Sequence, residues 1–127
     1  MTDQRAIILV DHGSRLQESN RLIETIALAF HERFSAQWAI VEPAHMELAE
    51  PSIATAYTRC VNRGATEIIV LPYFLGPGKH WNHDIPALTA AAAATFPATT
   101  FRIAPTLGLD DLMLQLLHKR LLECVSV

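Results

Sequence analysis

Four of the six histidines in this sequence lie in or beside short polar segments that follow aliphatic runs. They are His12, His45, His80 and His83. Neutral imidazole is the commonest nitrogen ligand that proteins offer to Co²⁺, Ni²⁺, Fe²⁺ and Zn²⁺. Glu47 adds a carboxylate two positions after one of these histidines. The residue types therefore indicate metal chemistry at a sparse site, whose open coordination positions favour exchange or catalysis over permanent holding of an ion.

Each of these residues also has an ordinary structural interpretation. His12 could cap a helix or bind a loop carbonyl, and Glu47 could pair with Arg15 or Lys79. His83 could do no more than begin a helix. His45 and Glu47 would point to the same face if the chain were extended between them. Spacing alone leaves these alternatives open, because histidines far apart in a sequence can match a metal site by chance.

The elements that would position these residues alternate between strand and helix. Continuous aliphatic runs and short apolar segments predict four strands, at residues 6–10, 38–46, 67–71 and 99–103. Apolar spacing, glycine and proline predict four helices, at residues 16–34, 51–63, 84–96 and 110–124. Such alternation is typical of a parallel sheet with right-handed crossovers, so we predict a single α/β domain over residues 1–127.

Ligands in open parallel sheets bind beyond the carboxyl ends of the strands. In this sequence those ends are residues 11–15, 45–51, 74–84 and 104–109. The four histidines named above fall within three of these segments. The candidate metal ligands are therefore expected at the edge of the predicted sheet where ligands bind.

Composition and missing motifs exclude several classes of protein. The chain has 127 residues, is 50% hydrophobic and carries a formal charge of −3, which suits a folded domain and disfavours a general nucleic-acid binder. Two cysteines are too few for a disulfide framework or an iron–sulfur cluster, and no apolar run is long enough for a membrane span. We therefore expect a cytoplasmic protein. The P-loop, GxGxxG and GxSxG motifs are absent.

Several segments together resemble the small sirohydrochlorin chelatases, the CbiX-type members of the class II chelatases. The matching segments are HGSR at 12–15, MELAEPSI at 46–53, VLPYFL at 70–75, GKH at 78–80, DIP at 84–86 and TLG at 106–108. The resemblance implies a chelatase-like, three-layer sandwich with flavodoxin-like winding and a four-stranded parallel sheet. It also implies an enzyme that inserts Co²⁺, or else Fe²⁺ or Ni²⁺, into sirohydrochlorin, in cobalamin or siroheme biosynthesis.

The resemblance also assigns roles to particular residues. His12 and His80 match the family's metal-binding catalytic histidines, and Glu47 matches its acidic residue. His45 and His83 depart from the expected pattern, so they are possible extra metal ligands. The length is that of a single-domain member, which implies a homodimer. No tightly bound cofactor is expected, since the divalent metal is itself a substrate.

The tetrapyrrole substrate carries many carboxylates, which need partners in the protein. We predict substrate contacts from polar, basic and aromatic residues near the strand ends. They are Ser14, Arg15, Phe74, Lys79 and Trp81. Two other functions remain open from the residues alone. One is a non-catalytic carrier of metal or tetrapyrrole, and the other is a phosphate-handling enzyme that uses His12, although the acidic Asp11 beside it would repel phosphate.

Overall fold

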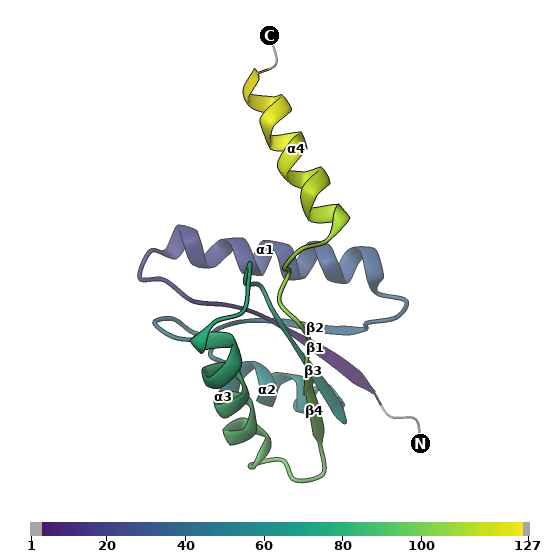
Figure 1. The fold of residues 1–127 in the computed structure, drawn as a ribbon. Coiled ribbons are helices and arrows are strands. Elements are labelled where there is room, and N and C mark those ends of the chain that lie inside the picture. Colours follow the sequence, from purple (N-terminus) through teal and green to yellow (C-terminus); the bar gives the residue numbers. More distant parts are fainter. Residues whose placement is uncertain (1–3, 126–127) are drawn as a thin grey trace.

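The fold is built on one parallel sheet of four strands (Figure 1). The structure is a computed structural model that describes residues 4–125, with the side chains of residues 80 and 81 outside the description. Its strands are β1 (Arg5–Asp11), β2 (Ile40–His45), β3 (Glu67–Pro72) and β4 (Thr100–Ile103), in the order β2-β1-β3-β4. The predicted α/β class, strand count and parallel pairing are confirmed, with boundaries close to those expected.

Helices cover the two faces of this sheet and make three layers (Figure 1). The helix α1 (Gln17–Phe34) packs on β1 and β2 from one side. The opposite face is covered by α2 (Ile53–Asn62) and α3 (Ile85–Ala93), and a short π-helix, η1 (His80–Asp84), leads into α3. Within residues 4–125, none of the helices combines the length and the hydropathy that crossing a bilayer requires.

The main hydrophobic core lies between the sheet and the α2–α3 layer. Ile8 and Ile68, from the two central strands, have no exposed surface, and Tyr57 of α2 is equally buried. The Tyr57 hydroxyl lies 2.7 Å from Oγ1 of Thr99, so its polar end has a partner inside the core. Alternate residues of β1, such as Ile7 and Leu9, face α1 and are also buried. This burial on both faces explains the continuous aliphatic run in the sequence.

The last helix, α4 (Asp111–Val125), does not join these layers. It projects away from the sheet (Figure 1), and none of its residues is buried. Its exposed apolar side chains are Leu112, Leu114, Leu116, Leu117, Leu121, Leu122 and Val125. On the α1 side of the sheet, Ile69 and Leu71 of β3 remain only partly buried.

Replacing Ile68 with alanine tests the central core. We expect the free energy of unfolding to fall by about 2–5 kcal/mol, because the substitution leaves a cavity between β3 and the α2–α3 layer. Urea unfolding followed by circular dichroism measures the change. Leu28→Ala is the matched control, since Leu28 is 72% exposed on α1. Equal losses for both variants would contradict this description of the core.

Candidate functional site

His12 is presented at the carboxyl edge of the sheet by the end of β1. Its imidazole stacks on the ring of Phe74, which follows β3, with ring centroids 4.1 Å apart and planes 13° from parallel. Phe74 is only 6% exposed, whereas His12 is exposed. The stacking fixes the orientation of the imidazole. It also leaves little of Phe74 for the contact with a macrocycle that the sequence suggested.

Glu47 is held beside this histidine by the backbone. The amide of Glu47 donates to the carbonyl of His12 at 3.1 Å, and the amide of Met46 donates to the carbonyl of Asp11 at 2.8 Å. Gly13 makes this approach possible, because it has φ +89° and a Cβ there would lie 1.8 Å from the Glu47 carbonyl oxygen. The local sequence around residues 12–13 therefore brings the predicted imidazole and carboxylate segments together.

Asp11 and His45 form a second pair, at the ends of β1 and β2 on the opposite face of the sheet. Nδ1 of His45 is 2.7 Å from a carboxylate oxygen of Asp11, the residue opposite it in the β1–β2 register. His45 is fully buried, and its Nε2 has no hydrogen-bond partner within the described part of the chain. Asp11 was not predicted to have a role, because the strand register that places it opposite His45 is set by the tertiary structure.

His45 and Glu47 do not share one face, because the chain beyond His45 is not extended as that expectation required. Regular pairing of β2 ends at His45, and the chain then bends through Leu48, which has φ 70°. As a result, the two side chains line different cavities. His45 lies on the α1 side of the sheet, whereas Glu47 lies beside α3.

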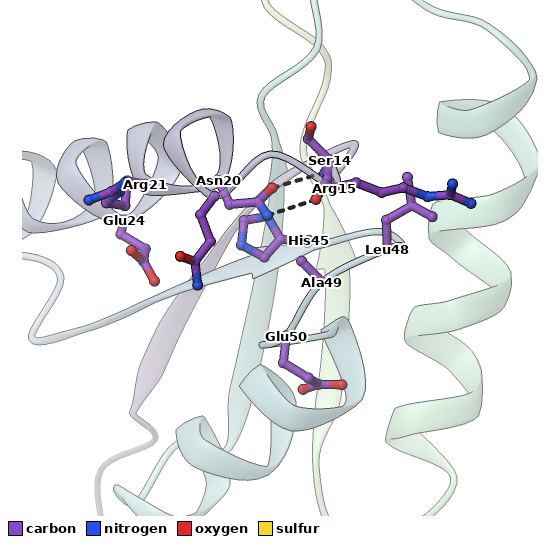
Figure 2. A pocket seen from close by; sticks show the side chains of 10 residues that line it. Ser14, Arg15, Asn20, Arg21, Glu24, His45, Leu48, Ala49 and Glu50 are labelled. Atoms are coloured by element: carbon purple, nitrogen blue, oxygen red, sulfur yellow. Dashed lines mark hydrogen bonds between the residues drawn. The ribbon is translucent and has the colours of Figure 1, made fainter.

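The cavity on the α1 side has a volume of about 500 Å³ and lies between the start of α1 and the loop at residues 48–50 (Figure 2). Ser14 and Arg15, both predicted to contact substrate, line it together with His45. Asn20 fixes the loop before α1, because its side chain accepts from the Ser14 amide at 2.9 Å and donates to the Ser14 carbonyl at 2.8 Å. Asn20 was not predicted from the sequence to have this role.

Glu50 also lines this cavity, but its carboxylate is hydrogen-bonded to residues at the start of α2. Its carboxylate accepts from the Thr55 hydroxyl at 2.7 Å and from the Ser52 amide at 3.0 Å. These bonds, the one from Thr55 above all, lower the pKa of Glu50 below its ordinary value. Ser52 in turn caps α2 by accepting from the Thr55 amide at 3.1 Å. Glu50 thus anchors the loop that follows His45.

The cavity on the other side is more apolar. It has a volume of about 340 Å³ and is lined by Met46, Glu47, Asp84, Ala87 and Leu88. Met46 and Leu88 also border a neighbouring hollow between α2 and α3. Flat apolar surface next to a carboxylate could accept one face of an aromatic macrocycle.

The loop after β3 and the π-helix η1 carry the other predicted residues. Lys79 is exposed, and so is His83, whose Nδ1 lies 3.1 Å from the Asp84 carboxylate. The side chains of His80 and Trp81 lie outside the described residues. Among the residues that are described, three or more histidine, cysteine or acidic side chains do not gather into a metal-binding group. The pairing of His12 with His80 therefore stays a prediction.

Known proteins are similar to this chain in sequence. The sequence pattern of the CbiX family matches residues 6–124. The sirohydrochlorin ferrochelatase (chloroplastic) of Arabidopsis thaliana is 48% identical over 124 residues, which are 98% of this chain and 54% of that protein. The chain spans about half the length of the first curated relatives it matches.

Two solved structures share the fold. The sirohydrochlorin chelatase SirB of Bacillus subtilis subspecies spizizenii, in complex with cobalt, superposes with a TM-score of 0.83 at 30% identity, over 94% of this chain and 50% of that one. A putative CbiX cobalamin-biosynthesis protein of Marinobacter aquaeolei superposes with a TM-score of 0.74 at 30% identity, over 96% of this chain and 98% of that one.

Gly13→Ala tests the backbone contact that joins His12 to Glu47. We expect the free energy of unfolding to fall by about 2–4 kcal/mol, because alanine is strained at positive φ and its methyl group meets the Glu47 carbonyl. Thermal unfolding measures the loss, and amide shifts at residues 46–48 report local displacement. Gly76→Ala is the control, since nothing lies within 4 Å of a Cβ there. An unchanged Gly13→Ala variant would refute the contact.

Proposed function

The chain belongs to the CbiX family of sirohydrochlorin chelatases, and from this we propose that it inserts a divalent metal ion into sirohydrochlorin. The observation that carries the proposal is the juxtaposition of His12 and Glu47 at the carboxyl edge of the sheet. Fe²⁺ and Co²⁺ are the candidate metals, because one relative is a ferrochelatase and another was solved with cobalt. Imidazole and carboxylate ligands accept both ions.

The reaction exchanges two pyrrole N–H protons for one M²⁺, so the site must deliver a cation and accept protons. We assign metal delivery to His12 and His80, whose imidazoles release an ion more readily than thiolates would. Glu47 is the proton acceptor or the electrostatic partner of the ion. Because Phe74 holds the His12 ring in place, the ligand atom keeps its direction while the metal leaves it.

The macrocycle would lie over the apolar cavity beside Glu47, with Met46 and Leu88 under the ring. Its peripheral carboxylates would then meet the basic and hydroxyl side chains near the strand ends. Arg15 and Ser14 border the cavity on the α1 side, and Lys79 is exposed on the loop after β3. Trp81 in η1 is the further predicted contact, and His83 in the same π-helix is a possible additional metal ligand. A cytoplasmic location stays a prediction.

A homodimer is the second part of the proposal. A second copy of the chain would bring a second α4 and a second sheet to the assembly. The exposed leucines of α4 are suited to cover the partly buried Ile69 and Leu71 of that second copy. Helices of this length gain most of their stability from packing, which an isolated α4 lacks.

An anaerobic assay of sirohydrochlorin with Co²⁺ or Fe²⁺ tests the activity. We expect turnover to fall at least about a hundredfold in His12→Ala, His80→Ala and Glu47→Gln, because each removes a group that handles metal or protons. The absorbance spectrum of the tetrapyrrole reports insertion. His31→Gln is the control, since His31 contacts the Ala39 carbonyl far from the site. Binding of metal and tetrapyrrole without turnover would indicate a carrier instead.

Sedimentation equilibrium tests the dimer. We expect the native chain to sediment as a dimer, and Leu117→Glu with Leu121→Glu to yield monomers, because buried charges would oppose packing of α4. Lys119→Glu is the control, as it changes charge on the polar stripe of the same helix. A native chain that stays monomeric at all concentrations would overturn this part of the proposal.

A further inference from the structure

Leu48 adopts a backbone conformation that leucine rarely takes. Its φ of 70° lies in the left-handed region, where a Cβ crowds the neighbouring carbonyl, and within residues 4–125 it is the one residue other than glycine with a positive φ. The side chain is large and apolar, yet 57% of the residue's surface is exposed. Glycine or asparagine would fit this conformation with less strain. Strain of this kind collects at functional sites, so we looked for a role of Leu48 outside folding.

Hydrogen bonds on both sides of Leu48 hold it in this conformation. Before it, the amide of Glu47 donates to the carbonyl of His12 at 3.1 Å. After it, the carboxylate of Glu50 accepts from the amide of Ser52 at 3.0 Å. The backbone of Leu48 therefore has a fixed place at the carboxyl edge of the sheet, and binding of a ligand there would not have to order it.

Leu48 lies at the boundary between the two cavities of this edge. It lines the cavity on the α1 side, whereas its neighbour Glu47 lines the apolar cavity beside α3. Figure 2 shows the side chain of Leu48 pointing toward that of Arg15, which lines the same cavity as Leu48. Exposed apolar surface is thus adjacent to a carboxylate along the chain and faces a guanidinium in space.

This order of groups matches a tetrapyrrole from its centre outward. The nitrogens that lose protons lie at the centre of the macrocycle, the pyrrole rings surround them, and the carboxylates lie at the periphery. If Glu47 takes a proton from the centre, the next residue lies beside one of the rings, because consecutive Cα atoms are only about 3.8 Å apart. Arg15 is then on the side where a peripheral carboxylate would meet a guanidinium.

We propose that Leu48 contacts a pyrrole ring of the substrate and is a binding residue of the chelatase site. The inference rests on the proposed function for the identity of the ligand. Contact would remove apolar surface from water on both partners, which offsets the steric cost of the left-handed conformation. Leu48 carries no group that holds a metal ion or a proton, so its contribution is to substrate affinity and not to the insertion step.

Anaerobic titration of the full chain with metal-free sirohydrochlorin tests the contact. We expect Leu48→Asn to raise the dissociation constant roughly tenfold, because asparagine accepts the left-handed conformation but replaces apolar surface with a polar amide. Leu48→Met should retain most of the affinity, since methionine keeps the apolar surface. Leu28→Asn is the matched control and should bind as the native chain does, because Leu28 is 72% exposed on α1, outside both cavities.

A purely structural role for Leu48 predicts the opposite order of affinities. Leu48→Asn would then bind at least as tightly as the native chain, because it relieves the strain, and that result would overturn the inference. Thermal unfolding shows that weaker binding does not come from unfolding, since we expect the Tm of Leu48→Asn to equal or exceed the native value. Should asparagine lower the Tm, Leu48→Gly carries the same test, because glycine accepts a positive φ without a Cβ.

An interface between copies of the chain is the other surface that could cover Leu48. Sedimentation equilibrium of Leu48→Asn distinguishes it from a substrate contact. We expect the variant to keep the oligomeric state of the native chain. Dissociation of a native dimer, together with unchanged binding of sirohydrochlorin, would place Leu48 in that interface and overturn the inference.

Turnover separates this inference from the proposed activity. With Co²⁺ or Fe²⁺ present, Leu48→Asn should raise KM for sirohydrochlorin with kcat retained, because the contact is made equally before and during metal insertion. If binding depends on Leu48 but the native chain inserts no metal, the proposed activity fails and the contact stands. If turnover is normal and Leu48→Asn has the native KM, only this inference fails. A native chain that does not bind sirohydrochlorin would overturn both.

Discussion

The close backbone approach between residues 12–13 and residues 46–47 is the constraint on which the site depends. It brings a histidine from the end of β1 and a glutamate from beyond β2 to the same point of the sheet edge. Only glycine allows it, because any Cβ at position 13 would overlap the Glu47 carbonyl oxygen. Phe74 then supports the imidazole from the end of β3, so three segments of the chain meet around one side chain.

Side-chain alternation at the same strand ends divides the edge into two chemically different halves. The half that faces α2 and α3 carries His12, Glu47 and apolar surface, which suit metal insertion into a flat macrocycle. The half that faces α1 carries the Asp11–His45 pair, and both basic and acidic side chains line the cavity there. The sheet edge therefore has an apolar cavity on one face and a more polar cavity on the other.

Because α4 projects away from the sheet, two apolar surfaces are left uncovered. A helix with seven exposed large apolar side chains and no buried residue exposes surface that water disfavours. The partly buried face of β3 presents a complementary apolar surface. In the proposed homodimer, exchange of α4 between the two copies would cover both surfaces.

The strand–helix alternation can be predicted from the residues alone, because buried parallel strands leave continuous aliphatic runs such as residues 6–10. The positions of His12 and Glu47 at the sheet edge can be predicted too, since both lie within two residues of a strand end. Three features could not be predicted: the pairing of Asp11 with His45, the divergence of His45 from Glu47, and the departure of α4 from the sheet. These outcomes depend on strand register, on the backbone bend at Leu48 and on what packs against an apolar helix. Local residue patterns do not encode such contacts between distant segments.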